Sequence, residues 1–203
     1  EIEKSGGAAI AVGCDVNVAA DIDAAIAATE DAFGSLEILV NNAGIAELDA
    51  PEHMSDAAWD SGIKTNRSSV FKFSRSAHPS FKRSGRGKII NIGSMYSIFG
   101  SPFAASYAAS KGGVVQLTRS LAVAWAKDNI QANVILPGWI TTDMTAPIRN
   151  DMPDLYRSIV ARTPAERFGE PGELAGTAVY LASDASNFVT GQSIAVCGGY
   201  SVS

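Results

Sequence analysis

Short hydrophobic runs alternate with longer amphipathic stretches along the whole chain. The short runs are almost entirely apolar and predict buried strands at residues 37–40, 88–92, 131–136 and 193–196, with a further candidate at 8–12. The longer stretches repeat their apolar residues at helical spacing and predict helices at residues 19–33, 56–81, 106–127, 155–161 and 173–182. Apolar strands that alternate with helices are typical of a parallel sheet covered on both faces. The pattern therefore predicts one doubly wound α/β domain over residues 1–203.

The start of the chain departs from the usual form of this Rossmann-like fold. Such domains open with a strand, a glycine-rich turn and a helix that together hold a dinucleotide phosphate, and no glycine-rich turn follows a strand here. Residues 1–7 instead have the pattern of a helix end with its glycine stop. We therefore expect the fold to be N-terminally incomplete, without its first strand–helix–strand unit. Either the printed sequence is a fragment, which we favour, or residues 8–12 pair directly with residues 37–40.

Composition and charge exclude several classes of protein. The 203 residues are 46% hydrophobic, and the net charge of −5 comes without a cluster of Lys or Arg, which argues against nucleic-acid binding. No apolar stretch reaches the roughly 20 residues of a membrane-spanning helix. Cys14 and Cys197, both expected at strand ends, do not suggest a disulfide scaffold, and His53 and His78 lack metal-ligand spacing. We expect a cytoplasmic protein that binds no metal, nucleic acid or membrane.

Candidate chemistry begins with a tyrosine and a lysine in the predicted helix 106–127. Tyr107 and Lys111 stand four positions apart, which places them on one helix face. Because a nearby ammonium favours the phenolate, the pair suits acid–base catalysis on an alcohol or carbonyl. Alone, an amphipathic helix with a surface lysine explains the pair equally well. Ser94 follows the strand at 88–92, at the sheet edge where ligands bind, and its hydroxyl is suited to orient a substrate oxygen.

Small and polar residues also end the strand at 37–40. Asn41-Asn42-Ala43-Gly44 lies at the same predicted edge of the sheet. Its small residues permit a cofactor to approach the backbone closely, although the sequence by itself is an ordinary turn signal.

These motifs, in this order, resemble the short-chain dehydrogenase/reductase family over residues 8–202. The residues that match are Asp15 and Val16 in the adenine segment; Asn42, Ala43 and Gly44 in the N-N-A-G motif; Asn66, Ser94, Tyr107 and Lys111 in the catalytic tetrad; Pro137, Gly138, Ile140 and Thr142 in the loop beside the nicotinamide; and residues 167–171 and 191–192 in the C-terminal pattern. The set is far more specific than any one motif.

The resemblance implies hydride transfer between NAD or NADP and a carbonyl or secondary alcohol. Tyr107 would exchange the proton, Ser94 would position the substrate oxygen, and Lys111 would lower the pKa of Tyr107 and bind the nicotinamide ribose. Asn66 would hold a water through a kink in its helix. The cofactor contacts implied are Asp15, Val16, Asn42, Ala43, Gly44, Tyr107, Lys111, Pro137, Gly138, Ile140 and Thr142. The segment that selects NAD or NADP would lie in the missing unit.

Substrate choice is expected to depend on residues 95–103 and 143–165. Arg149, Arg157 and Arg162 in the second stretch have the pattern of a solvated surface, although Arg149 or Arg157 is suited to bind a carboxylate. Residues 124–127 and 162–171 most resemble the gluconate and deoxygluconate dehydrogenases, so we expect a sugar acid or polyol. One alternative is a 3-oxoacyl carrier-protein reductase, which residues 65–71 and 140–145 resemble. The other is a non-catalytic, oligomer-forming remnant that binds no dinucleotide.

The resemblance also implies an oligomer, and two residues differ from the family pattern. Relatives commonly form homotetramers through the helices that carry Asn66 and Tyr107 and through the C-terminal strand, so we expect a homo-oligomer, most simply a tetramer. Gly93 stands where many relatives have serine, and Cys197 replaces an aspartate common before the terminal glycine pair. Neither departure removes a catalytic group.

Overall fold

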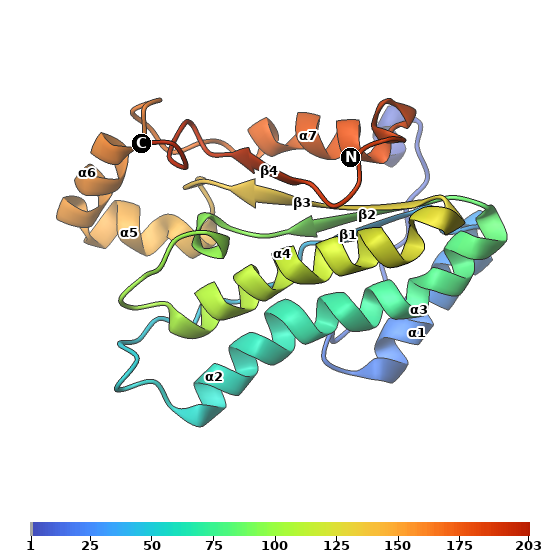
Figure 1. Cartoon of the computed structure of the whole chain (residues 1–203), viewed down its shortest axis with the longest axis horizontal. Helices are drawn as coiled ribbons and strands as arrows, with labels where there is room; N and C mark the ends of the chain where they lie inside the picture. The colour runs from blue at the N-terminus through green and yellow to red at the C-terminus, as the bar shows by residue number, and fades with distance from the viewer. Residues whose placement is uncertain (1) are drawn as a thin grey trace.

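Four parallel strands form the centre of the fold. A computed structural model describes residues 2–203 and orders the strands β1-β2-β3-β4, with bounds Ile38–Asn41, Gly87–Ile92, Ile130–Pro137 and Ser193–Val196. Every neighbouring pair is parallel, so that the carboxyl ends of all four strands lie at one edge of the sheet (Figure 1). The register pairs Asn41 of β1 with Asn91 of β2 near that edge.

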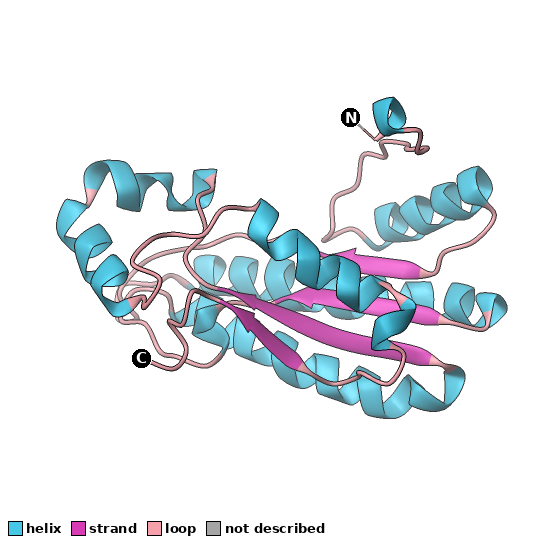
Figure 2. Ribbon diagram, turned by 90° about the horizontal axis from the view of Figure 1, so that it is seen from above, coloured by secondary structure: helices cyan, strands magenta, loops and turns pink. Residues whose placement is uncertain are grey.

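Helices cover both faces of the sheet (Figure 2). Their bounds are Ala19–Phe33 for α1, Asp56–Ile63 for α2, Ser69–Ser84 for α3, Ala105–Trp125 for α4, Ala146–Asp151 for α5, Pro153–Arg162 for α6 and Gly172–Ala182 for α7. Helices α3 and α4 pack on one face, α7 packs on the other, and α5 and α6 lie beyond the carboxyl end of β3. The predicted doubly wound, Rossmann-like fold class is confirmed.

The sequences of the strands are continuous apolar runs because both faces of the strands are buried. In β2, Ile89 packs with Phe81 of α3 and Leu121 of α4, whereas its neighbour Ile90 packs with Leu181 of α7. Successive strand residues point to opposite faces, and each of these isoleucines is only 1% exposed. This rigid centre fixes the positions of the loops at the carboxyl edge.

The predicted helix at 56–81 is interrupted. The structure divides it into α2 and α3, joined by the five-residue π-helical turn η2, Lys64–Ser68. Pro79 lies within α3 but does not end it. Turns of this kind are rare and frequently occur at functional sites, and this one carries Asn66.

The predicted strand at residues 8–12 is wrong. These residues form an extended coil outside the sheet, in which Ile10 is 49% and Val12 is 43% exposed. The alternative in which they pair with residues 37–40 is therefore wrong too. The alternating apolar pattern is that of a strand, but a strand needs a neighbour for its backbone groups, and residues 2–203 supply none beside it. Cys14, expected at a strand end, lies in this coil, whereas Cys197 does follow β4.

The helix end predicted at residues 1–7 is present. A short 3-10 turn, Glu3–Ser5, ends at Gly6 with a φ of 83°, and Glu1 lies outside the described residues. None of the helices within residues 2–203 combines the length and the apolar character needed to cross a bilayer.

Candidate active site

The carboxyl edge of the sheet brings the four predicted tetrad residues together. Ser94 follows β2, Tyr107 and Lys111 lie in the first two turns of α4, and Asn66 lies in the π turn. Hydrogen bonds connect the π turn, the turn after Ser94 and the end of β2 to α4. The predicted residues therefore share one site, although their chemical roles remain predictions.

Lys111 lies at the centre of the site and is buried. Its Nζ donates a hydrogen bond of 2.7 Å to the carbonyl oxygen of Ile92, and only 4% of the residue is exposed. Burial without a carboxylate partner disfavours the charged form and lowers the pKa of Lys111 to about 8. A Cβ placed on Gly44 would be 3.5 Å from this Nζ, so the loop after β1 passes close to the ammonium.

Tyr107 is half-buried beside Lys111 and Ser94. Desolvation raises the pKa of its phenol, and a hydrogen bond with the Ser94 side chain acts in the opposite direction. The Nζ of Lys111 lies 5.7 Å from the centre of the tyrosine ring. The pKa of Tyr107 is therefore raised and not lowered as expected, because burial has the largest effect on the phenol.

Ser94 begins a short 3-10 turn, Met95–Ser97, that fixes its position. Its Oγ accepts a hydrogen bond of 3.1 Å from the amide of Tyr96, and its own amide donates to the Oγ of Ser97 at 3.1 Å. The Ser97 hydroxyl in turn donates to the carbonyl oxygen of Lys111 at 2.9 Å. The serine loop is thereby tied to the helix that carries Tyr107 and Lys111.

Asn66 is fully buried and connects three segments. Its Oδ1 accepts from the amide of Ile45 at 2.8 Å, and its Nδ2 donates to the Ile45 carbonyl at 2.9 Å and to the Oγ of Ser110 at 3.1 Å. The π turn aims the side chain inward, so that the amide ties the loop after Gly44 to α4. The expected kink at Asn66 is present, and its visible effect is to position this loop.

A chain of buried amides under the site was not predicted. The Nδ2 of Asn41 donates to the Oδ1 of Asn91 at 2.8 Å, and the Nδ2 of Asn91 donates to the Oγ1 of Thr118 at 2.8 Å. These links join β1, β2 and α4. An asparagine within the apolar run 88–92 was the available signal, because a buried amide requires partners.

The predicted cofactor loops border the same edge. Asn42 and Ala43 are exposed, Ile140 is buried and pairs with Gly169, and Thr142 caps a short 3-10 turn, Asp143–Thr145. A Cβ on Gly138 would be 2.6 Å from the Cα of Cys197, so the chain passes β4 at a distance that only glycine permits. Pro137 is the last residue of β3.

Asp15 and Val16 lie in the short segment that precedes α1. The amide of Asp15 donates to the Oδ2 of Asp21 at 2.9 Å, and the Nδ2 of Asn17 donates to the Oγ1 of Thr65 at 3.2 Å. Through Asn17 this segment reaches the residue that precedes Asn66. The structure therefore places the predicted adenine segment beside the π turn.

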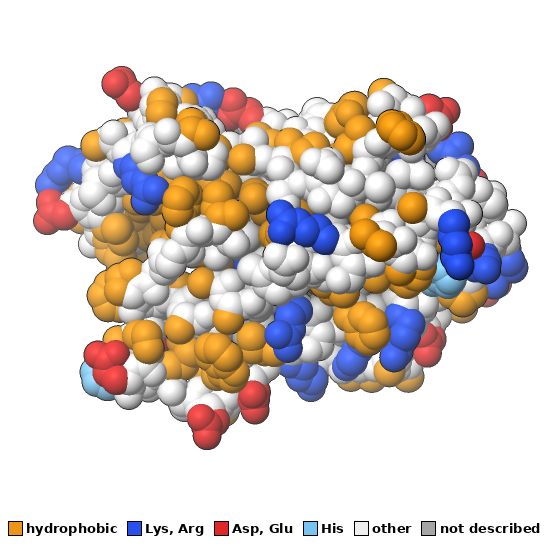
Figure 3. Space-filling model, in the orientation of Figure 1, with side chains coloured by type: hydrophobic (Ala, Val, Ile, Leu, Met, Phe, Trp, Pro, Cys, Tyr) orange, Lys and Arg blue, Asp and Glu red, His pale blue; other side chains and the backbone are white. Residues whose placement is uncertain are grey.

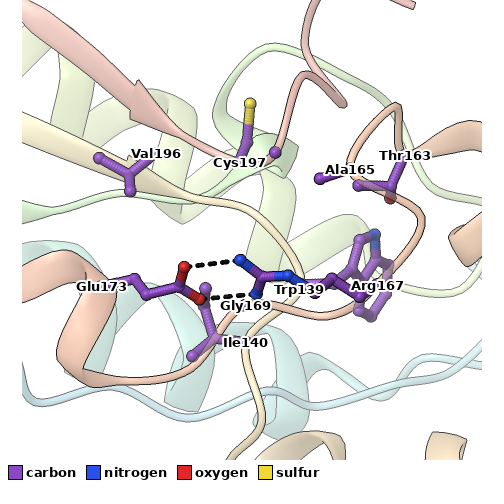
Figure 4. Close-up of a pocket in the computed structure, with 10 residues that line it drawn as sticks. Trp139, Ile140, Thr163, Ala165, Arg167, Gly169, Glu173, Val196 and Cys197 are labelled. Carbon is purple, nitrogen blue, oxygen red and sulfur yellow. Dashed lines mark hydrogen bonds and ion pairs between the residues drawn. The ribbon is translucent and has the colours of Figure 1, made fainter.

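A small cavity adjoins the predicted nicotinamide loop on the α7 side (Figure 4). Trp139, Ile140 and Cys197 contribute to its wall, and none of the four tetrad residues lines it. Arg167 and Glu173 form a bidentate ion pair at its rim, with both N–O distances 2.7 Å. This pair and the amide of Glu170 hold the pKa of Glu173 at about 2, and the ion pair ties α7 to the segment before it.

The residues at the edge fit the nicotinamide half of a dinucleotide. The buried Nζ of Lys111 with its single acceptor, the space beside Gly44 and the exposed Asn42 suit a ribose and its neighbouring groups. A glycine-rich phosphate turn between a strand and a helix is absent from residues 2–203. Within the same residues, no three His, Cys, Asp or Glu side chains are grouped so as to hold a metal ion.

Known proteins resemble this chain over nearly its whole length. A family model described as enoyl-(acyl carrier protein) reductase matches residues 1–201. A galactitol 2-dehydrogenase (L-tagatose-forming) of Cereibacter sphaeroides is 42% identical over 97% of this chain and 78% of its own. A 2-dehydro-3-deoxy-D-gluconate 5-dehydrogenase of Formosa agariphila is 41% identical over 98% of this chain and 75% of its own. A 3-oxoacyl-[acyl-carrier-protein] reductase of Staphylococcus aureus is 37% identical over 98% of this chain and 80% of its own.

Solved structures of dehydrogenases and reductases also resemble this chain. A gluconate 5-dehydrogenase from Burkholderia cenocepacia, in complex with NADP and tartrate, superimposes with a TM-score of 0.94 at 37% identity, covering 99% of this chain and 78% of that one. An actinorhodin polyketide ketoreductase with NADPH gives a TM-score of 0.93 at 32% identity, covering 99% and 81%. With the family model, the relatives and the fold in agreement, the chain belongs to the short-chain dehydrogenase/reductase family, whose members are NAD(P)-dependent oxidoreductases.

Proposed function

We propose that this protein transfers a hydride between NAD or NADP and a sugar acid or polyol, with Asn66, Ser94, Tyr107 and Lys111 as its catalytic tetrad. The observation that carries the proposal is the convergence of Ser94, Tyr107 and Lys111 at the carboxyl edge of the sheet, where the Ser94 side chain is close enough to the phenol of Tyr107 to affect its pKa and the Lys111 Nζ lies 5.7 Å from the centre of the tyrosine ring. A hydroxyl that both orients an oxygen and contacts the proton donor is what carbonyl reduction requires.

Each residue has a distinct part in the reaction. NAD(P)H, when bound, supplies the hydride to the carbonyl carbon. Tyr107 donates its phenolic proton to the carbonyl oxygen as the C–O double bond becomes a single bond, and it accepts that proton in the oxidation. Ser94 holds the same oxygen by a hydrogen bond. Lys111, close to the loop after β1, binds the ribose hydroxyls and stabilises the phenolate that forms.

Asn66 acts by position. Its side chain already bonds Ile45 and Ser110, and so it fixes the cofactor loop relative to α4 and supports a water beside Lys111. The cofactor would be held by the exposed and close-packed groups along the edge, which are Asp15, Val16, Asn42, Ala43, Gly44, Tyr107, Lys111, Pro137, Gly138, Ile140 and Thr142.

The substrate class rests on the relatives and on the residue pattern. The relatives named for galactitol and deoxygluconate, and the solved gluconate 5-dehydrogenase with tartrate, act on or hold polyols and hydroxy acids. A 3-oxoacyl carrier-protein reductase remains the second candidate, since one such enzyme is 37% identical. That activity needs a basic surface for the carrier protein, and the net charge of −5 weighs against it.

Exposed apolar side chains support a homo-oligomer. Trp59 of α2, Phe71 of α3 and Val123 of α4 are 41%, 43% and 85% exposed, and Figure 3 shows hydrophobic side chains gathered over these helices. Exposed apolar side chains that gather on one face often mark a protein interface. We infer a tetramer built from this face and the C-terminal strand, and light scattering of the purified protein tests the subunit count.

The test of the function compares substrates and a matched variant. D-gluconate, galactitol and a 3-oxoacyl thioester are each assayed with NAD(H) and NADP(H), for the wild type and for Tyr107→Phe. Turnover of the acid or polyol that the variant loses supports the proposal, and turnover of the thioester alone supports the second candidate. Titration with NADPH, followed by energy transfer from Trp125 and Trp139, completes the test. If the protein shows no turnover and binds no cofactor at millimolar concentration, both candidates are overturned and the non-catalytic remnant is favoured.

A further inference from the structure

Arg149 projects from the short helix that follows the nicotinamide loop. Helix α5 lies at the carboxyl end of β3 (Figure 1), and its Ile148 packs against the hydrophobic cluster that contains Met95 of the serine loop. The guanidinium folds back on the loop, and its Nη2 donates to the carbonyl oxygen of Thr142 at 3.3 Å. The arginine is therefore held beside the edge where the tetrad and the cofactor loops meet.

The guanidinium has hydrogen-bonding capacity that the protein does not use. Its Nε is buried and has no acceptor, and among residues 2–203 no carboxylate lies within ion-pair distance of it. The acceptor that the guanidinium has among residues 2–203, the Thr142 carbonyl, is neutral. A buried donor without a partner costs free energy, and the partly exposed guanidinium has no anion of the described chain to balance its charge, so an anion from outside the chain can supply that partner.

The other two arginines of the segment 143–165 are already engaged. Arg157 forms an ion pair with Asp154 on the same helix. Arg162 stacks over the rings of Phe99 and Tyr200, at 4.7 Å and 4.2 Å from their centres, and donates to the Tyr200 hydroxyl at 3.2 Å. Arg162 thus connects α6 to the serine loop and to the C-terminus. Only Arg149 remains available to a ligand.

We propose that Arg149 recognises the carboxylate of the substrate. The inference rests on the proposed function, and it assigns the residue by which a sugar acid is bound in preference to a polyol. A guanidinium binds a carboxylate through two parallel N–H donors, which fixes orientation as well as position. The substrate is then held at both ends, by Arg149 at the carboxylate and by Ser94 and Tyr107 at the reacting oxygen. A phosphate of the cofactor has the same oxyanion chemistry, and the test separates the two sources.

The test compares Arg149→Met with Arg157→Met, a matched loss of an arginine on the next helix. For Arg149→Met, kcat/KM for D-gluconate falls about 10- to 100-fold, mainly through KM, whereas kcat/KM for galactitol and the Kd of NADPH change less than about 2-fold. Arg157→Met leaves all three values near those of the wild type. Arg149→Lys, which keeps the charge without the paired donors, recovers part of the gluconate activity.

Two results would overturn the assignment. Equal losses of kcat/KM for gluconate and galactitol in Arg149→Met show that the guanidinium does not recognise a carboxylate. A parallel rise in the Kd of NADPH assigns the guanidinium to the cofactor phosphate. Gluconate binding is also followed by calorimetry in the presence of NADPH, which needs no turnover. If the wild type turns over galactitol but binds no gluconate, the inference fails while the dehydrogenase function survives. If it binds neither cofactor nor substrate, the proposed function fails first, and this inference with it.

Discussion

The side chain of Asn66 bonds both backbone polar groups of Ile45, accepting from its amide at 2.8 Å and donating to its carbonyl at 2.9 Å. The two residues are 21 positions apart, and this amide is the direct link between the π turn and the loop after β1. Its removal is predicted to loosen the cofactor loop without touching the sheet.

Asn66→Ala should therefore lower stability as well as activity. The substitution leaves the Ile45 amide and carbonyl and the Ser110 hydroxyl with fewer partners in a buried region, and we expect the free energy of unfolding to fall by about 2 to 4 kcal/mol. Urea denaturation measures the change. Asn150→Ala, at an exposed position on α5, serves as the control and should change stability by less than about 0.5 kcal/mol. Equal effects of the two substitutions would contradict a clamping role for Asn66.

Tyr107→Phe should separate proton transfer from binding. Loss of the phenolic hydroxyl is expected to lower kcat about 100- to 10,000-fold, because a positioned acid–base group contributes that much. The Kd of NADPH and the melting temperature should stay near the wild-type values, since the ring remains. Tyr180→Phe, at an exposed site on α7, is the matched control. A kcat that survived in Tyr107→Phe would assign the proton transfer to another group.

The buried Lys111 should make stability depend on pH. Its pKa is lowered from 10.5 to about 8 in the folded protein, so between these values the unfolded chain binds more protons than the folded one, and the free energy of unfolding rises with pH. Lys111→Met removes this contribution. The wild type should gain about 2 to 3 kcal/mol relative to the variant between pH 7.5 and pH 10.5. Urea denaturation at both pH values tests this, and a difference that does not change with pH would mean that Lys111 is not titrating in that range.

Gly138→Ala should disturb the junction between β3 and β4. The new Cβ would meet backbone as well as side chain, at 2.6 Å from the Cα of Cys197 and 3.1 Å from its carbonyl oxygen. Because backbone cannot turn away, we expect a loss of about 1 to 3 kcal/mol in the free energy of unfolding. Gly172→Ala is the matched control, since nothing lies within 4 Å of its added Cβ. Thermal unfolding of both variants compares them, and equal melting temperatures would show that the junction is free to shift.

Features set by nearby residues were predictable from the sequence. The strands at 88–92, 131–136 and 193–196 have unbroken apolar runs, and the four-residue spacing of Tyr107 and Lys111 fixes their common face on any helix. Ser94 could be placed at the carboxyl edge because it follows a strand directly. For these residues local pattern and tertiary position agree.

Other features depend on contacts that the sequence pattern does not reveal. Residues 8–12 alternate like a strand, but pairing depends on a neighbour that lies elsewhere or is absent from the described residues. The hydrogen bond from Asn41 to Asn91 spans 50 positions, and nothing in the sequence near either residue identifies the other as its partner. The pKa of Tyr107 depends on how completely the surrounding residues remove water, and this burial raises the pKa, opposite to the expected direction.

The outer edge of β1 has a consequence for the behaviour of this chain in solution. No strand within residues 2–203 pairs with that edge, and Ile38 and Val40 are 42% and 49% exposed on its surface. An open edge with apolar side chains is a template onto which another molecule can add a strand. A further strand added to this edge, from whatever polypeptide, would pair with the outer backbone groups of β1 and extend the parallel sheet beyond its four strands.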